Sequence, residues 1–324
     1  MAAPRRRRRI ALALIATTMT LGTIAAGCGG DDEGGSTGSG GDLLGKVLVD
    51  GSSTVGPLTS AAAEDFTGEN GGVDVSVRTS GTGGGFEVFC KGETDISNAS
   101  REIKDEEAKV CADAGIEYEE LRIASDGITV VTKKGGVVGD NLNLTLDQLK
   151  AIWSKGSKIN DWSQIPGGGF PAAKLTLAGA DSQSGTYDFF NETVLGEDAA
   201  GEVLSPRQDY SASADDNVTV KAVTGSAQGL GYFGYTYYEE NADSLAAIAL
   251  DGVAPSAETI TDGSYPLSRP LYIYVSKASL AKPEVLAFTK YYVENAVTLA
   301  EELQFVPAPQ DSIDADLQKL AAYE

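Results

Sequence analysis

The chain has 324 residues, of which 25 are basic and 47 are acidic, so its formal net charge is −22. This charge repels nucleic-acid phosphates and argues against general nucleic-acid binding. The chain has no histidine, which excludes Ser-His-Asp and Cys-His nucleophile systems, histidine-containing zinc sites and imidazole acid–base catalysis. The hydrophobic fraction of 42% is ordinary for a globular protein, and at roughly 150 residues per domain the length predicts two domains.

The first residues have the pattern of an export signal. The basic run Arg5–Arg9 precedes the apolar run Ile10–Ile24, and small residues then precede Cys28. The apolar run is too short and too rich in threonine for a membrane span, which needs about 20 apolar residues. The end of the signal resembles a bacterial lipobox, in which the cysteine is acylated and becomes the new N-terminus, although Ala25 stands where leucine is usual. An ordinary secretory signal cleaved near Ala26 is the alternative.

We therefore expect residues 1–27 to be a lipoprotein signal peptide, and residues 28–41 to be the lipidated cysteine followed by a flexible linker. Residues 29–41 read GGDDEGGSTGSGG and offer no apolar side chain for burial. A tether of this composition spans about 20 Å. It would hold the exported body at the outer face of the cell membrane.

The other two cysteines are Cys90 and Cys111. With Cys28 lipidated, they form an even pair in a compartment that permits disulfides. We expect a Cys90–Cys111 bridge, and two buried thiols are the alternative. Two isolated cysteines without histidine do not predict a metal site, and we expect no metal and no cofactor.

Three places in the body share one pattern: a short strand-like run, a cluster of Gly, Ser and Thr, and a helix-like run. Proline and small residues at such a junction mark a helix start. The three sets are Val47–Val49 with Asp50–Gly56 and Pro57–Phe66, Val73–Val77 with Ser80–Gly85 and Phe86–Cys90, and Leu175–Leu177 with Ala178–Thr186 and Tyr187–Leu195.

Further segments fit the same alternation of strands and helices, which predicts an α/β fold. Gly127–Thr132 and Leu271–Val275 are strand-like, whereas Leu146–Trp153, Asn217–Val223 and Pro283–Leu303 are helix-like.

The Gly/Ser/Thr turns have chemistry suited to an anion. Such a turn at a helix start presents free backbone N–H groups, hydroxyl donors and the positive end of the helix dipole. One turn of this kind is common in strand–helix connections and indicates only structure. Three turns favour an oxyanion site, provided that Ser53 and Thr54, Thr82, and Ser184–Thr186 converge.

Rival motifs fail. The sequence has no G-x-x-x-x-G-K-[ST] and is therefore not a P-loop protein. Gly229–Gly234 matches G-x-G-x-x-G, but Tyr235–Glu240 does not read as the apolar helix that should follow. Ser184 lies in Ser-Gln-Ser-Gly-Thr rather than in G-x-S-x-G.

Six motifs, which together cover about residues 45–310, resemble in sequence and in order those of the phosphate-binding protein family of bacterial Pst-type ABC importers. The resemblance implies a two-lobed periplasmic-binding-protein (type II) fold with the ligand in the cleft between lobes. It also implies that the chain crosses between lobes near residues 124–126 and 266–271, so that 42–125 plus 269–324 form lobe 1 and 126–268 form lobe 2. The motifs are Gly51–Val55, Ser80–Phe86, Asp95–Arg101, Ser184–Thr186, Asp215–Val218 and Pro266–Pro270.

The resemblance also implies a set of phosphate ligands. The positions that match the family's donors are Ser53, Thr54, Thr82, Ser184, Gly185 and Thr186. The family often has aspartate where this chain has Arg101, and arginine where this chain has Ala180. We interpret the two departures as compensating, with the cationic ligand moved to Arg101, whose planar fork suits a tetrahedral oxyanion. A structural ion pair is the alternative role for Arg101.

Without the family's aspartate, another carboxylate should accept the phosphate proton, which sulfate lacks near pH 7. Asp126 is the first candidate, followed by Asp188 and Asp216; solvated surface or helix capping is the alternative for each.

These observations predict an extracytoplasmic, lipid-anchored, monomeric receptor that binds inorganic phosphate and delivers it to the membrane permease of an ABC importer. A receptor for sulfate, molybdate or another oxyanion is the alternative, followed by a phosphatase-like hydrolase.

Overall fold

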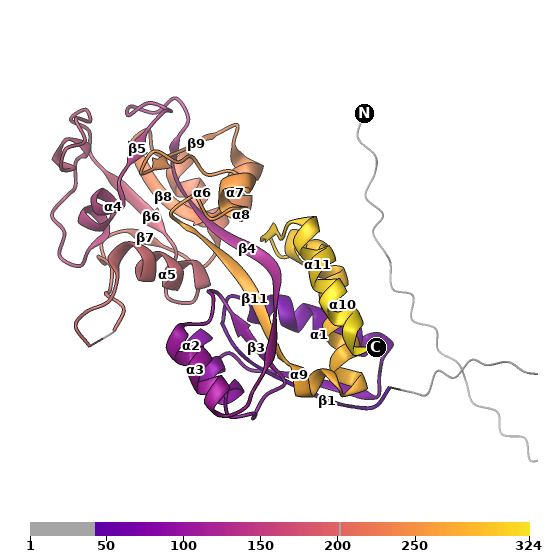
Figure 1. Cartoon of the computed structure of the whole chain (residues 1–324). Helices are drawn as coiled ribbons and strands as arrows, with labels where there is room; N and C mark the ends of the chain where they lie inside the picture. Colours follow the sequence, from indigo (N-terminus) through magenta and orange to yellow (C-terminus); the bar gives the residue numbers. More distant parts are fainter. Residues whose placement is uncertain (1–42, 201) are drawn as a thin grey trace, which may run out of the picture. The chain divides into compact units, whose positions relative to one another are not determined.

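The computed structural model describes residues 43–200 and 202–324 (Figure 1). The signal peptide predicted for residues 1–27 and the lipidated cysteine and linker predicted for residues 28–41 lie outside these residues. Within the described part of the chain, no helix is long and apolar enough to cross a membrane.

A mixed sheet runs through the described residues. Its strand order is β2-β1-β3-β11-β4-β8-β6-β7, and β9 and β12 also pair with β4. A separate two-stranded sheet joins β5 and β10. The strands are β1 (Gly45–Gly51), β2 (Val73–Val77), β3 (Ile96–Ala99), β4 (Tyr118–Lys133), β5 (Asn143–Leu144), β6 (Thr176–Gly179), β7 (Ser211–Ala212), β8 (Gly229–Gly234), β9 (Leu245–Ala247), β10 (Ala249–Leu250), β11 (Ser268–Ser276) and β12 (Val306–Pro307).

Helices cover the sheet, and several begin at the signals that the sequence provides. Proline occupies the first turn of α1 and the first position of α10, and Thr145 and Gln148 form a capping box at the start of α4. The helices are α1 (Gly56–Glu69), α2 (Thr82–Phe89), α3 (Asp105–Asp113), α4 (Leu146–Trp153), α5 (Gly185–Phe190), α6 (Asp216–Thr224), α7 (Tyr235–Asn241), α8 (Ala257–Thr261), α9 (Lys277–Leu280), α10 (Pro283–Glu302) and α11 (Gln310–Leu320).

The buried apolar side chains form two large clusters, which give the fold its two lobes. The first includes Phe66 of α1 and Phe288 of α10, and the second includes Trp153 of α4 and Phe190 of α5. Strand β4 contributes to both, because its first half lies in one cluster and its second half in the other. Figure 1 shows β4 and β11 running together between the lobes.

Two predictions about local structure need correction. The helix expected at residues 86–90 begins four residues earlier, at Thr82, because Gly81 has a φ of +84° and ends the preceding loop. The helix expected at residues 187–195 is α5 followed by a π-helical turn at Asn191–Leu195.

The G-x-G-x-x-G segment forms β8, a strand that pairs with β4 and β6, so its glycines do not form a phosphate-binding loop.

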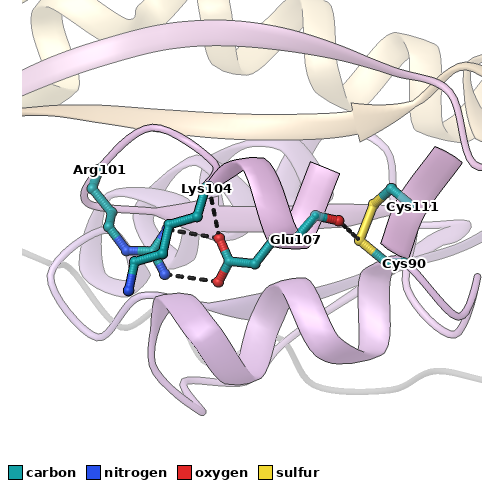
Figure 2. The surroundings of a disulfide bond; sticks show 5 residues. All are labelled: Cys90, Arg101, Lys104, Glu107 and Cys111. Carbon is teal, nitrogen blue, oxygen red and sulfur yellow. Dashed lines mark hydrogen bonds and ion pairs between the residues drawn. A yellow bond between two sulfur atoms is a disulfide. The ribbon is translucent and has the colours of Figure 1, made fainter. Parts of the chain in front are cut away.

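Cys90 and Cys111 form a disulfide, with their Cα atoms 4.3 Å apart (Figure 2). Cys90 directly follows α2, and Cys111 lies in α3. Both cysteines belong to a small buried cluster with Phe86 and Phe89. The bridge therefore joins the two helices next to the end of β3.

Candidate functional site

A cavity of about 610 Å³ draws its walls from both lobes. Hydroxyl, guanidinium and carboxylate groups dominate the lining, as expected for a polar ligand. The lining residues are Ser52, Ser53, Thr54, Gly81, Thr82, Gly83, Ser100, Arg101, Lys104, Asp188, Phe189, Glu192, Thr193, Glu197 and Arg269.

The turn between β1 and α1 brings Ser53 and Thr54 to the cavity. Gly51 has a φ of +136°, and a Cβ there would collide with the carbonyl oxygen of Asn98. Only glycine therefore lets β1 pass this close to β3. The turn beyond it is held by Ser52, whose backbone N–H donates to the Asn98 oxygen at 2.9 Å.

Thr82, the first residue of α2, also reaches the cavity. Its hydroxyl lies 3.1 Å from the hydroxyl of Ser100 and accepts the Ser100 backbone N–H at 3.2 Å. Two of the three Gly/Ser/Thr turns therefore meet on the lobe-1 wall.

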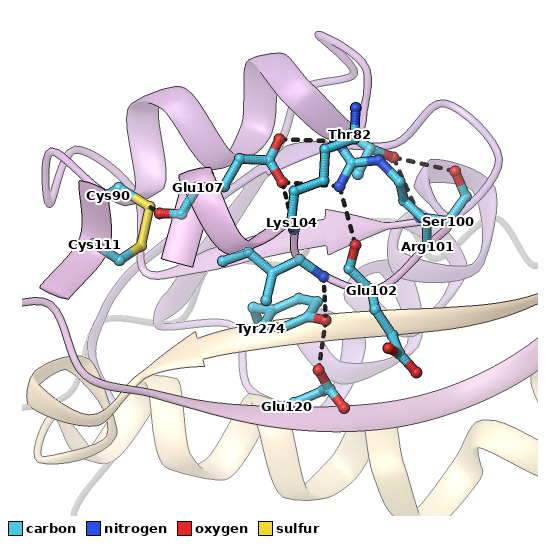
Figure 3. Close-up of polar contacts among 11 residues, drawn as sticks. Thr82, Cys90, Ser100, Arg101, Glu102, Lys104, Glu107, Cys111, Glu120 and Tyr274 are labelled. Carbon is cyan, nitrogen blue, oxygen red and sulfur yellow. Dashed lines mark hydrogen bonds and ion pairs between the residues drawn. A yellow bond between two sulfur atoms is a disulfide. The ribbon is translucent and has the colours of Figure 1, made fainter. Parts of the chain in front are cut away.

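Arg101 lines the same wall. It also forms an ion pair with Glu107, the kind of contact that the sequence offered as an alternative to ligand binding (Figure 3). Its Nη1 and Nη2 atoms each lie 2.8 Å from an oxygen of Glu107, and Nη1 also donates to the Glu102 carbonyl at 3.0 Å. Burial raises the pKa of Glu107, but the Arg101 hydrogen bonds and the Lys104 backbone N–H outweigh burial, and the net pKa is lowered. Arg101 thus combines an ion pair with a position at the cavity.

A second guanidinium, that of Arg269 on β11, lines the cavity and was not among the predicted ligand residues. Its Nη2 donates to Thr54 Oγ1 at 2.8 Å, and Nε and Nη2 donate to Asp126 Oδ2 at 3.1 and 3.0 Å. The Arg269 side chain is 10% exposed, and its guanidinium carbon lies 3.9 Å from the centre of the Phe189 ring. The sequence signal was the arginine within Pro266–Pro270, one of the six family motifs, to which no ligand role was assigned.

Asp126, the first candidate for accepting the ligand's proton, instead holds Arg269. It is not among the cavity-lining residues, and the contact is between β4 and β11 side by side. The carboxylate therefore orients the guanidinium and leaves both N–H groups of Arg269 Nη1 without a hydrogen-bond acceptor among the described residues.

Carboxylates form the facing wall of the cavity. Asp188 and Glu192 line it from α5 and the π-helical turn, and Glu192 Oε2 lies 3.9 Å from Arg269 Nη1. Desolvation by surrounding protein raises the pKa of both carboxyls, partly offset by the charge of Arg269. Glu192 was not predicted, because its part in the site depends on the π-helical turn.

The third turn, Ser184–Thr186, lies at the start of α5 but is not part of the cavity lining. A Cβ at Gly185 would lie 3.5 Å from Thr54 Oγ1, so the turn faces the β1–α1 turn closely. Asp216 also lies outside the lining, where burial raises its pKa to about 6. Ala180, the position that the family often fills with arginine, is fully buried.

Comparison with known proteins places this architecture among binding proteins. Residues 34–296 match the family model described as a PBP superfamily domain. The phosphate-binding protein PstS of Staphylococcus saprophyticus is 41% identical over 310 residues, which cover 94% of this chain and 92% of that protein. Protein SphX of Synechococcus elongatus is 41% identical over 281 residues, covering 84% and 80% of the two chains.

A solved structure agrees with these sequence matches. The crystal structure of a possible phosphate binding protein from Planctomyces limnophilus has a TM-score of 0.80 and 40% identity to this chain. The match covers 87% of this chain and 99% of the other.

Proposed function

Since the chain belongs to the phosphate-binding protein family of the PBP superfamily, whose members are solute-binding receptors rather than enzymes, we propose that it binds inorganic phosphate in the cavity between its lobes. The observation that carries this proposal is the pairing of two oriented guanidinium groups, Arg101 and Arg269, with hydroxyl-bearing turns around one cavity. Charge-assisted hydrogen bonds from such groups are the stronger ones available to an oxyanion. Titration calorimetry of the purified protein with phosphate tests the proposal.

The ligand contacts that we propose come from both lobes. Arg101 and Arg269 supply the cationic donors, and the cavity-lining hydroxyls of Ser53, Thr54 and Thr82 supply neutral ones. Ser184, Gly185 and Thr186 contribute after the lobes close, because their turn already faces Thr54. The cavity is much larger than one tetrahedral anion, and closure would shrink it around the ligand.

The hinge for this closure consists of β4 and β11. We propose residues 42–125 plus 269–324 as lobe 1 and residues 126–268 as lobe 2, because the two large apolar clusters meet near these boundaries. Arg269 pairs with Asp126 at the hinge itself. A ligand that draws Arg269 toward the cavity would favour the closed arrangement, which an ABC permease can recognise.

We propose that two carboxyls on the lobe-2 wall, Asp188 and Glu192, select phosphate over sulfate. Near pH 7 a phosphate monoanion or dianion has an O–H group that can donate a hydrogen bond to a carboxylate, whereas sulfate has none. An unprotonated carboxylate facing sulfate would leave two anions in repulsion. We therefore propose that Asp188 and Glu192 accept the hydrogen bond from phosphate, a role for which Asp126 was the first candidate and Asp188 a later one.

The variants Glu192→Gln and Asp188→Asn test this selectivity. Each removes a negative charge from the cavity wall, so sulfate binding should tighten relative to phosphate, with the affinity ratio falling about tenfold. Calorimetric titration of both anions at pH 7.5 measures the ratio. Glu202→Gln, an exposed lobe-2 carboxylate outside the cavity lining, is the control. An unchanged ratio in both cavity variants would contradict the selectivity role.

We also propose that the protein is exported and anchored by lipid at Cys28, where it supplies phosphate to a membrane permease. Three sequence features support this anchor: a signal-like N-terminus, small residues before the cysteine, and the polar tether after it.

Cys28→Ala should release the protein from the membrane fraction into the soluble extracytoplasmic fraction, because the acylated side chain is lost. Fractionation followed by immunodetection measures the distribution, and Ser36→Ala in the tether is the matched control. Membrane retention of the Cys28 variant equal to wild type would remove the lipoprotein proposal.

A further inference from the structure

Glu107 does not line the cavity, yet it makes the main contact with a side chain that does. Its two carboxylate oxygens each accept one hydrogen bond from Arg101 at 2.8 Å, and the exposed fractions of the two side chains are 33% for Arg101 and 21% for Glu107. Figure 3 shows the two groups meeting beside Thr82 and Ser100.

The geometry of these contacts determines which edge of the guanidinium is left for a ligand. Arginine has five N–H donors in a fixed planar arrangement. Glu107 takes one from Nη1 and one from Nη2, and the Glu102 carbonyl takes the other Nη1 donor. The donors that remain are Nε–H and one N–H of Nη2, which have no acceptor among the described residues. These two lie on one edge and can bind two oxygens of a tetrahedral anion together.

Glu107 is itself held firmly. Its Oε2 accepts the backbone N–H of Lys104 at 2.9 Å, which caps the start of α3. Cys111 follows one helical turn later on α3, and the Sγ of Cys90 lies 3.5 Å from the Glu107 carbonyl oxygen (Figure 2). The disulfide thus ties the helix that carries Glu107 to α2, whose first residue is Thr82.

We propose that Glu107 is the positioning residue for phosphate binding: it occupies one edge of the Arg101 guanidinium and thereby presents the Nε–Nη2 edge to the anion. This inference rests on the proposed function, in which Arg101 is a phosphate ligand. Glu107 would therefore strengthen phosphate binding, although its negative charge alone would weaken it. A carboxylate near the site repels the anion, whereas the positioning role stabilises the bound state because Arg101 loses little side-chain freedom on binding.

The variant Glu107→Gln therefore tests the proposal: loss of the negative charge alone would tighten phosphate binding, whereas loss of the positioning contact would weaken it. The amide offers only one acceptor oxygen to the two Arg101 donors, and its own N–H₂ faces them unfavourably. We expect phosphate to bind about threefold to tenfold more weakly, because the Arg101 side chain would no longer be held in place before the ligand binds and would lose its freedom on binding. Glu107→Asp keeps the charge but shortens the side chain, and we expect an intermediate loss. Glu106→Gln removes the same charge from an exposed neighbour in the same helical turn and should change affinity less than twofold.

A double-mutant cycle separates positioning from a general loss of structure. On an Arg101→Ala background, Glu107→Gln should change phosphate affinity less than twofold, because the side chain through which it acts is absent. Calorimetry on the purified full chain gives the affinities, and thermal melts report folding. Equal or tighter binding by Glu107→Gln, or the same loss on both backgrounds, would overturn the inference alone. Absence of phosphate binding by the wild type would overturn the proposed function and the inference together.

Discussion

Arg269→Ala is expected to weaken phosphate binding at least a hundredfold, the largest effect of any single substitution in the cavity. The Arg269 side chain is almost fully buried at the hinge, and its Nη1 has no hydrogen-bond acceptor among the described residues and lies 3.9 Å from Glu192 on the cavity wall. A hydrogen bond to a charged group contributes about 1.5–3 kcal/mol, and two such bonds correspond to a hundredfold or more in affinity.

The same substitution leaves Asp126 without its ionic partner, so thermal stability should also fall. The double variant Arg269→Ala with Asp126→Asn separates the two effects, because the amide has no charge to leave unpaired. We expect it to recover most of the lost Tm and none of the lost affinity. Recovery of phosphate binding along with Tm would mean that Arg269 supports the hinge and does not bind the anion.

Arg101→Ala is expected to weaken phosphate binding about tenfold to a hundredfold, because the anion loses a bidentate, charge-assisted contact. The loss is smaller than for Arg269 because the Arg101 side chain is 33% exposed and water screens its charge. Thr82→Val and Ser184→Ala should each have a smaller effect, since backbone N–H donors remain in both turns. Arg101→Lys should recover only part of the affinity, because an ammonium group cannot supply the planar fork.

Lys109→Ala is the control for Arg101→Ala. It removes a positive charge from the same lobe at a side chain that is 72% exposed and that pairs, among the described residues, only with Asp113. The phosphate affinity of this variant should stay within twofold of wild type. Titration calorimetry measures all these variants after thermal melts have shown that they fold. Near-native affinity of a folded Arg101→Ala would make the Glu107 ion pair the whole role of Arg101.

Local patterns in the sequence predicted much of the fold. The helix predicted at residues 146–153 has those bounds in the structure, because a capping threonine and an apolar periodicity act within one short segment. The alternating valines of Val73–Val77 likewise form β2. The α/β class and the two-lobed fold followed from the order of such segments together with the family resemblance.

The candidate site was harder to predict where contacts join distant parts of the chain. Arg269 acquires its role from Asp126, 143 positions away, and from Thr54, 215 positions away. The pairing of β4 with β11 creates this neighbourhood, and no local pattern specifies it. Asp126, predicted as an acceptor for the ligand, is part of the same long-range contact: its Oδ2 accepts two hydrogen bonds from Arg269, which no local pattern shows.

Glu107 illustrates a second limit. The sequence marks it as one of several acidic residues at the start of a helix, Asp105, Glu106 and Glu107, and all three suit the helix dipole equally. Only the folded chain shows that Glu107 alone turns toward Arg101. The side chain that pairs with Arg101 is therefore indistinguishable in sequence from its two exposed neighbours.

Titration calorimetry of the purified protein with phosphate, arsenate and sulfate at pH 7.5 tests the central claim most directly. We expect one binding site for phosphate. Arsenate should bind with similar affinity, because it has the same shape and also has an O–H group at this pH. Sulfate should bind at least a hundredfold more weakly than phosphate. Binding of sulfate as tight as phosphate, or no heat of binding with phosphate, would contradict a phosphate receptor built around Arg101 and Arg269.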